Sequence, residues 1–328
     1  MSRTDACLIF NPVAGQGEPE EDLARIRELL EPEINLDIRF TTETQDADEI
    51  ASEAIAQGAT TIIASGGDGT LSAAASALVG TDIPLGVISR GTANAFAAAL
   101  ELPDTIEAAC QTILGGATRV VDAAKCNDRP MVLLAGIGFE AETVERADRQ
   151  AKKRFGMLAY VMAGLQELRQ LESFEAEIET EDKVITVTAA AVTVANAAPP
   201  TSILAQGPVG VIFDDGLLDI TVVSPVSQIG AIAASSHLLR TAWSETAASN
   251  RDDIGYLRAK RVIVRTDPPQ KLVLDGEIIG NTPIDVECVP GGLTLFVPPD
   301  AAPPAPMEKL EGLPELTIES KSSAGWSV

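Results

Sequence analysis

The chain has 328 residues, of which 45% are hydrophobic and 22% are charged, as is typical of a protein with about two globular domains. Acidic residues outnumber basic residues by 48 to 24, giving a net charge of −24. This excess argues against nucleic acid as a partner, because a phosphate backbone requires clustered cations. The single histidine, His237, excludes any site built on two imidazoles and lies in an apolar helical pattern that favours a structural role. Carboxylates, hydroxyls, backbone amides or a metal ion are therefore expected to carry the chemistry.

No two of the four cysteines are spaced like metal ligands or a redox pair. Cys7 and Cys126 lie in apolar, strand-like runs, which predicts buried free thiols and fits a reducing compartment. The N-terminus lacks the pattern of a signal peptide, and no run of about 18 apolar residues is present to cross a bilayer. We therefore expect a cytoplasmic protein.

The first 125 or so residues alternate strand and helix patterns. The expected strands are residues 6–10, 34–40, 61–64 and 84–88. A glycine-containing turn at 11–17 precedes a helix that carries Leu23 and Ile26, and a second helix begins at Asp46. Strands that alternate with helices predict a three-layer α/β domain around a parallel sheet.

After Val121 the pattern changes to short strands at close spacing, with helical patterns only at 156–171 and 226–242. The expected strands are 131–135, 174–181, 186–194, 217–223, 261–265, 271–274, 284–288 and 293–297. This predicts a mainly antiparallel β-sandwich domain. The predicted organisation is a first domain at 1–128, a second at 129–299 whose last strand returns to the first, and a proline-rich, disordered tail at 300–328.

Three glycine-rich turns follow predicted strands of the α/β domain: Asn11–Gly15, Gly66–Thr70 and Gly91–Asn94. In a parallel sheet such turns meet at the carboxyl edge, where their backbone amides can bind an anion. One such turn alone is more often an ordinary loop, but three on one edge predict a polyphosphate site. Asp68 among phosphate-binding amides would repel phosphate unless Mg²⁺ lies between them.

These motifs, in this order and spacing, resemble the diacylglycerol kinase catalytic domain, and most closely its bacterial soluble, YegS-like lipid kinases. The resemblance continues through Gly136–Ala141, Lys152–Tyr160, Asp214–Asp219 and Leu274–Glu277, so it covers about residues 5–299. It implies an α/β domain of the kind shared by NAD kinases and diacylglycerol kinases, followed by a β-sandwich.

The resemblance also implies roles for individual residues. Glu277 matches the general base, and Asp68 and Asp122 match acidic residues of a Mg²⁺ network near the phosphates. A structural Mg²⁺ would be held by the Asp215 carboxylate and the carbonyls of Ile212 and Leu217. The positions that match nucleotide-binding residues are Asn11, Pro12, Val13, Ala14, Gly15, Thr41, Gly66, Gly67, Asp68, Gly69, Thr70, Leu71, Ser72 and Thr92.

The third loop departs from the family pattern. Ala95 follows Asn94 where many bacterial diacylglycerol kinases carry an aspartate of the same acidic network. In this respect the loop is more similar to that of the sphingoid-base kinases, where a small residue is usual. Ser89 replaces a common proline, and Gln16 replaces a basic residue often found after the first loop.

Several of these motifs have a purely structural alternative. Asp275-Gly276 between two apolar runs is typical of a type I′ hairpin turn, with Glu277 then on the solvent face. Asp214–Gly216 is likewise compatible with a plain turn before a strand. Thr41 and Asp122 are compatible with ordinary residues at the ends of strands.

Two groups of cations stand out on this acidic chain. Arg146, Arg149, Lys152, Lys153 and Arg154 lie beside an apolar helical pattern. They are as compatible with a patch that contacts anionic lipid headgroups as with a solvated charged face. A second group is expected to protect a strand edge and comprises Arg258, Lys260, Arg261 and Arg265.

The sequence therefore predicts a lipid kinase that uses ATP and Mg²⁺ to phosphorylate a lipid hydroxyl, such as that of diacylglycerol or a sphingoid base. It would contact the membrane peripherally, bind no nucleic acid, and leave open a homodimer. The alternatives are an NAD- or sugar-kinase-like phosphotransferase, which would need polar motifs absent from the second half, and a catalytically weakened nucleotide- or lipid-binding regulator, which Ala95 favours.

Overall fold

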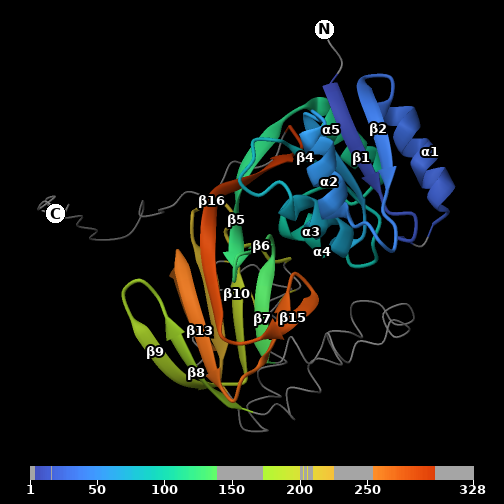
Figure 1. Ribbon diagram of the computed structural model, residues 1–328. Helices are drawn as coiled ribbons and strands as arrows, with labels where there is room; N and C mark the ends of the chain where they lie inside the picture. The colour runs from blue at the N-terminus through green and yellow to red at the C-terminus, as the bar shows by residue number, and fades with distance from the viewer. Residues whose placement is uncertain are drawn as a thin grey trace, which may run out of the picture.

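The computed structural model describes residues 4–15, 17–138, 173–199, 202, 205, 210–224 and 254–299 (Figure 1). Several predictions concern residues outside this part of the chain. They are the cationic group Arg146–Arg154, the helical patterns at 156–171 and 226–242, His237, and the tail from residue 300.

The N-terminal region is built on four parallel strands in the order β2-β1-β3-β4. These strands are β1 (Thr4–Phe10), β2 (Ile34–Phe40), β3 (Thr61–Gly66) and β4 (Leu85–Ser89). The helices that connect and follow them are α1 (Pro19–Leu30), α2 (Ala47–Ala56), α3 (Asp68–Ser76), α4 (Ala95–Ala99) and α5 (Ile106–Gly115). The predicted α/β domain with a parallel sheet is confirmed.

Successive side chains of each strand point to opposite faces of this sheet. Its apolar side chains therefore pack against two layers of helices. Cys7 and Ile9 of β1 pack in a core with α2, α3 and α4. Leu8 and Phe10, which point to the other face, pack in a second core with α1 and α5. Because successive residues of a strand face opposite sides, a continuous apolar strand needs helices on both faces.

The C-terminal region is a β-sandwich. One layer is an antiparallel six-stranded sheet in the order β12-β11-β10-β7-β14-β15. Its strands are β12 (Ile254–Ala259), β11 (Leu218–Val223), β10 (Ala191–Ala195), β7 (Leu134–Gly138), β14 (Lys271–Leu274) and β15 (Glu277–Asn281). The opposite layer is formed by β5 (Thr118–Cys126), β6 (Arg129–Met131), β8 (Phe174–Glu179), β9 (Val184–Ala189), β13 (Arg261–Asp267) and β16 (Ile284–Phe296). A shared core that includes Ile137, Val194, Val264 and Val286 lies between the two layers.

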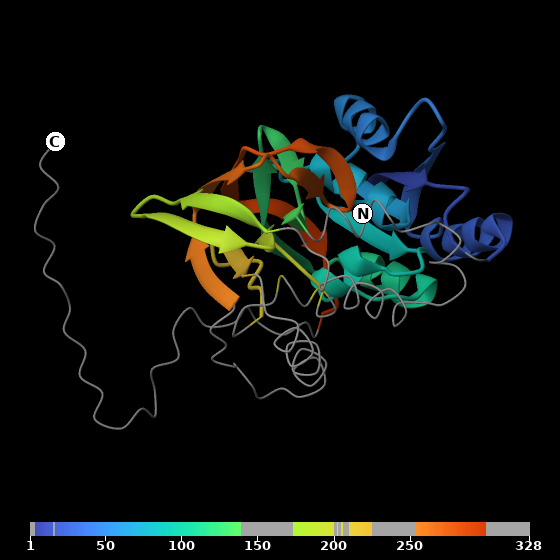
Figure 2. The ribbon, with the colours of Figure 1, turned by 90° about the horizontal axis from the view of Figure 1, so that it is seen from below.

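The long strand β16 joins the two regions, because the layer that contains it is continuous with the parallel sheet. Its first half pairs antiparallel with β13, and β5 pairs antiparallel with β16 from Val286 to Phe296. Near its end Leu295 also pairs parallel with Leu85 of β4. Figure 1 shows β16 running from the sandwich into the α/β region, whereas Figure 2 shows the β8–β9 hairpin projecting from the opposite end.

Sequence periodicity missed several boundaries in the sandwich. The run predicted as one strand at 186–194 forms β9 and β10, which belong to different sheets. The two strands predicted at 284–288 and 293–297 are the single strand β16, whose pairing with β5 shifts between Val289 and Leu293. The Pro-Gly-Gly at 290–292 looked like a strand end, but it is an irregularity within one strand.

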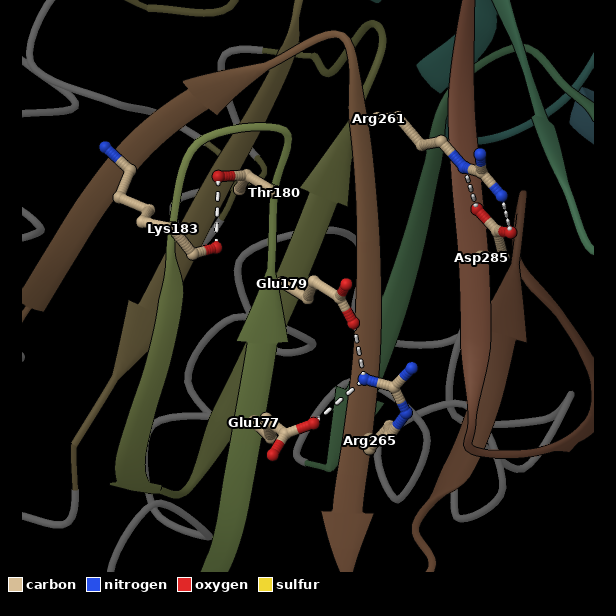
Figure 3. A network of polar contacts seen from close by, with 7 residues as sticks. All are labelled: Glu177, Glu179, Thr180, Lys183, Arg261, Arg265 and Asp285. Carbon is tan, nitrogen blue, oxygen red and sulfur yellow. Dashed lines mark hydrogen bonds and ion pairs between the residues drawn. The ribbon is translucent and has the colours of Figure 1, made fainter.

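The prediction that Arg261 and Arg265 protect a strand edge is wrong, because β13 lies between β16 and β8. Arg261 pairs with Asp285 of β16 through two contacts, of 2.9 and 2.5 Å (Figure 3). Arg265 contacts Glu177 and Glu179 of β8, each at 2.8 Å. These ion pairs join neighbouring strands, but because they are exposed each contributes little to stability.

All four cysteines are free and buried, as predicted for Cys7 and Cys126. Burial raises the pKa of the Cys7 thiol to about 11, so the thiol stays protonated. Within the described residues, none of the helices has the length and apolar character needed to span a membrane.

Candidate active site

The three glycine-rich loops lie side by side at the carboxyl edge of β1, β3 and β4, which are neighbours in the sheet. We call them loop 1 (Asn11–Gly15), loop 2 (Gly66–Thr70) and loop 3 (Gly91–Asn94). Asn11 Nδ2 donates to Thr70 Oγ1 at 2.8 Å, which connects loop 1 to loop 2. The N–H of Arg90, just before loop 3, donates to the Gly66 carbonyl at 2.7 Å. The juxtaposition predicted from the parallel sheet is therefore present.

Two glycines of these loops are required by close packing. A Cβ on Gly66 would lie 2.6 Å from the Thr70 Cβ. A Cβ on Gly15, whose φ is +94°, would lie 2.9 Å from the Arg90 carbonyl oxygen. Larger residues would push the loops apart at the point where they meet.

A cavity of about 290 Å³ opens between these loops and the sandwich. Loop residues line one side, and Glu277 of β15 contributes from the sandwich. The lining residues are Asn11, Ala14, Asp46, Gly67, Gly69, Thr70 and Glu277. The cavity thus brings five predicted nucleotide-binding residues together with the predicted general base.

Glu277 reaches the cavity because it begins the second strand of a hairpin that projects toward the α/β region (Figure 1). Asp275, at φ +48°, and Gly276, at φ +92°, form the hairpin turn expected from the Asp-Gly dipeptide. The Glu277 side chain is exposed. The structural alternative and the functional prediction for this motif are therefore compatible, since the turn delivers the carboxylate to the cavity.

Asp275 anchors this hairpin. Its carboxylate accepts hydrogen bonds from the backbone N–H groups of Val132, Leu133 and Leu134, at 2.8–2.9 Å. Burial raises the pKa of Asp275 to about 6; the three N–H groups act in the opposite direction, and nearby Glu277 adds to the rise. The sequence identifies Asp275 only as a turn residue, because its partners lie more than 140 positions away.

Asp68, the predicted acidic residue of loop 2, is held by a contact with the segment that follows loop 3. Asp68 begins α3 between the two lining residues Gly67 and Gly69. Its Oδ1 accepts a hydrogen bond from the Phe96 N–H at 2.9 Å, so it fixes the start of α4. Ala95 is the first residue of that helix.

The other predicted nucleotide-binding residues do not line the cavity. Thr41 follows β2, and its N–H donates to the Phe10 carbonyl at 3.1 Å. Leu71 and Ser72 are buried in the first turns of α3, whereas the Val13 side chain is 90% exposed. Pro12, Gly15 and Thr92 belong to loops 1 and 3, and Gly66 ends β3.

Asp122 lies at a different place from the cavity lining. Its Oδ2 accepts from the Gly216 N–H at 2.6 Å, and its Oδ1 accepts from the Gly291 N–H at 2.8 Å. Burial raises the pKa of Asp122, the two N–H groups lower it, and the carboxylates of Asp215 and Asp214 raise it again. Asp122 therefore connects the Asp-Asp-Gly turn to the irregular part of β16.

Asp122 belongs to a group that we call the acidic cluster, formed by Asp122, Asp214, Asp215, Asp219, Arg119 and Arg258. Arg119 pairs with Asp214 at 2.5 Å, and Arg258 pairs with both Asp215 and Asp219. The Asp219 Oδ2 atom is buried without a hydrogen-bond partner. Four carboxylates thus face two guanidinium groups, and the cluster keeps an excess of negative charge.

The predicted ligands of the structural Mg²⁺, Ile212, Asp215 and Leu217, belong to the turn beside this cluster. Asp215 Oδ1 accepts from the Leu217 N–H at 3.1 Å, and its Oδ2 contacts Arg258. Within the part of the chain that is described, no three His, Cys, Asp or Glu side chains are grouped as a metal site. The predicted set contains only one such side chain, that of Asp215, because its other two ligands are backbone carbonyls.

Glycine loops at the edge of a parallel sheet, with an exposed carboxylate across the cavity, define a phosphotransferase-type arrangement. The family model described as "Diacylglycerol kinase catalytic domain" matches residues 5–126, and that described as "YegS C-terminal NAD kinase beta sandwich-like domain" matches residues 134–297. The chain therefore belongs to the diacylglycerol kinase catalytic domain family, a family of ATP-dependent lipid kinases, as the sequence resemblance indicated.

Individual relatives agree with this assignment. A diacylglycerol kinase of Bacillus subtilis is 30% identical over 291 residues, which cover 85% of this chain and 91% of the relative. A Xanthomonas oryzae protein named "Probable lipid kinase YegS-like" is 32% identical over 280 residues, covering 81% and 88%. The solved structure of a diacylglycerol kinase from Bacillus anthracis superposes with a TM-score of 0.71 at 27% identity, covering 91% of this chain and 98% of that one. A further relative, an uncharacterized protein of Synechocystis sp., is 50% identical over 302 residues, covering 89% and 70%.

Proposed function

We propose that this protein transfers the γ-phosphoryl group of ATP to the hydroxyl of a lipid of the diacylglycerol or sphingoid-base type. The observation that carries the proposal is the cavity in which Glu277 lies opposite Asn11, Gly67, Gly69 and Thr70. Loops of this kind at the edge of a parallel sheet bind phosphates through backbone N–H groups. A positioned carboxylate is the group that an alcohol acceptor requires.

In this mechanism Glu277 accepts the proton of the lipid hydroxyl. The hydroxyl oxygen forms a bond to the γ-phosphorus, the bond from that phosphorus to the β–γ bridging oxygen breaks, and ADP leaves. Loops 1 and 2 hold the phosphates, with Asn11 and Thr70 fixed on each other by their hydrogen bond. Most of the rate enhancement in such a reaction comes from positioning and charge stabilisation, which suits a site built of loops.

The donor chemistry of the cavity fits Mg²⁺. Asp46 and Glu277 are both acidic and line the space proposed for a polyphosphate, and Asp68 lies between two lining glycines. Anions so close together require a cation between them. When bound, Mg²⁺ would neutralise charge that develops on the transferred phosphoryl group. We assign its binding to Asp68, and to the phosphates themselves.

The excess negative charge of the acidic cluster supports a second, structural cation at the turn of Ile212, Asp215 and Leu217. The unpartnered Asp219 oxygen adds to that support. Such a cation would share Asp215 with Arg258, whose guanidinium already contacts this carboxylate. Asp122, which holds the same turn through Gly216, would act through the position of the turn rather than on the phosphates.

Transfer of radiolabelled γ-phosphate from ATP to a panel of pure acceptor molecules tests the proposal. The panel includes diacylglycerol, a sphingoid base, NAD and a sugar phosphate, each assayed with Mg²⁺ and with EDTA. We expect Mg²⁺-dependent labelling of one lipid class, and a higher Tm with Mg²⁺ than with EDTA if the structural site is occupied. Labelling of NAD or the sugar phosphate alone would refute the lipid acceptor, and nucleotide binding without any transfer would favour a regulator.

A further inference from the structure

A buried arginine lies beneath the proposed phosphate loops. Arg90 follows β4 directly and precedes loop 3, and its side chain is only 2% exposed. Its guanidinium carbon lies 4.1 Å from the centroid of the Phe10 ring. A buried guanidinium is costly unless its donors are satisfied, so its partners show what it stabilises.

Two of these partners are carbonyl groups of loop 1. Arg90 Nη1 donates to the Asn11 carbonyl at 2.9 Å, and Nη2 donates to the Ala14 carbonyl at 3.1 Å. Nε donates to Asp22 of α1 at 2.8 Å. The planar guanidinium thus binds both ends of loop 1 and the helix that follows it, which an ammonium group could not do with the same fixed geometry.

The backbone of the same residue contacts the other two loops. The Arg90 N–H donates to the Gly66 carbonyl of loop 2, and its carbonyl lies beneath Gly15. Gly91, the next residue, packs against Gly67, where a Cβ would lie 3.2 Å from the Gly67 Cα. Arg90 is therefore the point at which all three loops are joined.

This placement has an electrostatic consequence for the cavity, because Asn11 and Ala14 also line it. Their carbonyl oxygens are the negative ends of peptide dipoles and would repel a phosphate that approached them. Because both oxygens accept hydrogen bonds from the buried Arg90 guanidinium, they face the interior of the α/β region. The positive charge also lies directly behind the loop that faces the phosphates.

We propose that Arg90 is a positioning residue for nucleotide binding, which holds loop 1 in the shape that accepts the phosphates of ATP. It does not touch the reacting atoms in this proposal. The inference rests on the proposed function, because loop 1 must bind nucleotide for its shape to matter. Asp22 is its auxiliary partner, since it orients the guanidinium through Nε.

The test measures ADP binding by calorimetry and steady-state kinetics in Arg90→Met and Arg90→Lys. We expect the Kd for ADP and the KM for ATP to rise about tenfold or more in Arg90→Met, and less in Arg90→Lys. The KM for the lipid should stay within about twofold, because Glu277 is held by the sandwich. Arg25→Met is the matched control, since Arg25 lies on the exposed surface of the same helix and forms two ion pairs, with Glu28 and Glu107.

If Arg90→Met fails to fold, Asp22→Asn and Arg90→Lys decide the question, because both keep a filled interior. Asp22→Asn should raise the Kd for ADP severalfold with little change in Tm. Folded variants that bind ADP as tightly as the unmodified protein would overturn the role of Arg90. If the unmodified protein bound neither ADP nor ATP, the proposed function itself would fail instead.

Discussion

Glu277 and Asp122 are both acidic residues that the sequence placed in one catalytic network, yet their surroundings in the fold are opposite. Glu277 is exposed at the tip of a hairpin and faces a cavity. Asp122 is 4% exposed, and each of its oxygens accepts a backbone hydrogen bond. A carboxylate that faces open space is available to take a proton, whereas one already bonded on both oxygens serves to fix the backbone.

The largest effect is expected for Glu277, the exposed carboxylate of this pair. Glu277→Gln should lower kcat by about 10²- to 10⁴-fold, because the amide cannot accept the hydroxyl proton. ADP binding and Tm should change little, since the side chain is exposed. Phosphate transfer, calorimetry and thermal unfolding measure the three quantities. Glu175→Gln, at an exposed site on β8, is the control, and turnover equal to that of the unmodified protein would exclude Glu277 as the base.

Asp122→Asn should affect stability first. The amide nitrogen cannot accept the bond from Gly216 or Gly291, so one of these partly buried hydrogen bonds is lost, at a cost of about 1–3 kcal/mol of unfolding free energy. Urea unfolding measures this loss. We expect a loss of activity that follows the loss of structure. A variant as stable as the unmodified protein but inactive would instead place Asp122 in the chemistry, as the family resemblance implied.

Asp275, which anchors the hairpin that carries Glu277, offers a test based on the pH dependence of stability. Its pKa is raised from 3.8 to about 6 in the folded protein, so the folded state binds more protons than the unfolded state between those values. The free energy of unfolding therefore falls as the pH rises from about 4 to about 6, and the contribution of Asp275 levels off above that. Relative to Asp275→Asn, the unmodified protein should lose up to about 3 kcal/mol over this range.

Urea unfolding of both proteins at several pH values measures this difference, in which the titrations of other carboxylates largely cancel. A difference between the two proteins that is constant from pH 4 to pH 7 would contradict the raised pKa. Movement of the hairpin in Asp275→Asn should also lower kcat through Glu277, at a pH where both proteins are folded.

The smallest effect is expected on the exposed face of the sandwich. Arg265→Gln removes two cross-strand ion pairs, with Glu177 and Glu179 (Figure 3). Because both partners are exposed and screened by solvent, Tm should shift by no more than about 2 °C and activity should not change. A larger shift that vanishes in high salt would show that this ion-pair network contributes more than exposed pairs usually do.

The elements of the α/β region were predictable because local patterns determine them. Buried runs such as Ala6–Phe10 and Thr61–Ala64 predicted β1 and β3, and the glycines that follow predicted where ligand-binding loops begin. The sandwich was harder, because an uninterrupted run of Thr, Val and Ala does not show where the chain passes from one sheet to the other. The break between β9 and β10 falls within such a run.

By itself, the sequence determined the family, the α/β and sandwich organisation, the three loops, and Glu277 as the candidate base. Tertiary structure alone decided which residues hold that site in place. Arg90 finds its carbonyl partners across 76 and 79 positions, and Asp275 finds its three N–H partners across 141 to 143. Periodicity and motif spacing describe contacts within a few residues, whereas buried polar groups are satisfied by whatever distant backbone the fold brings to them.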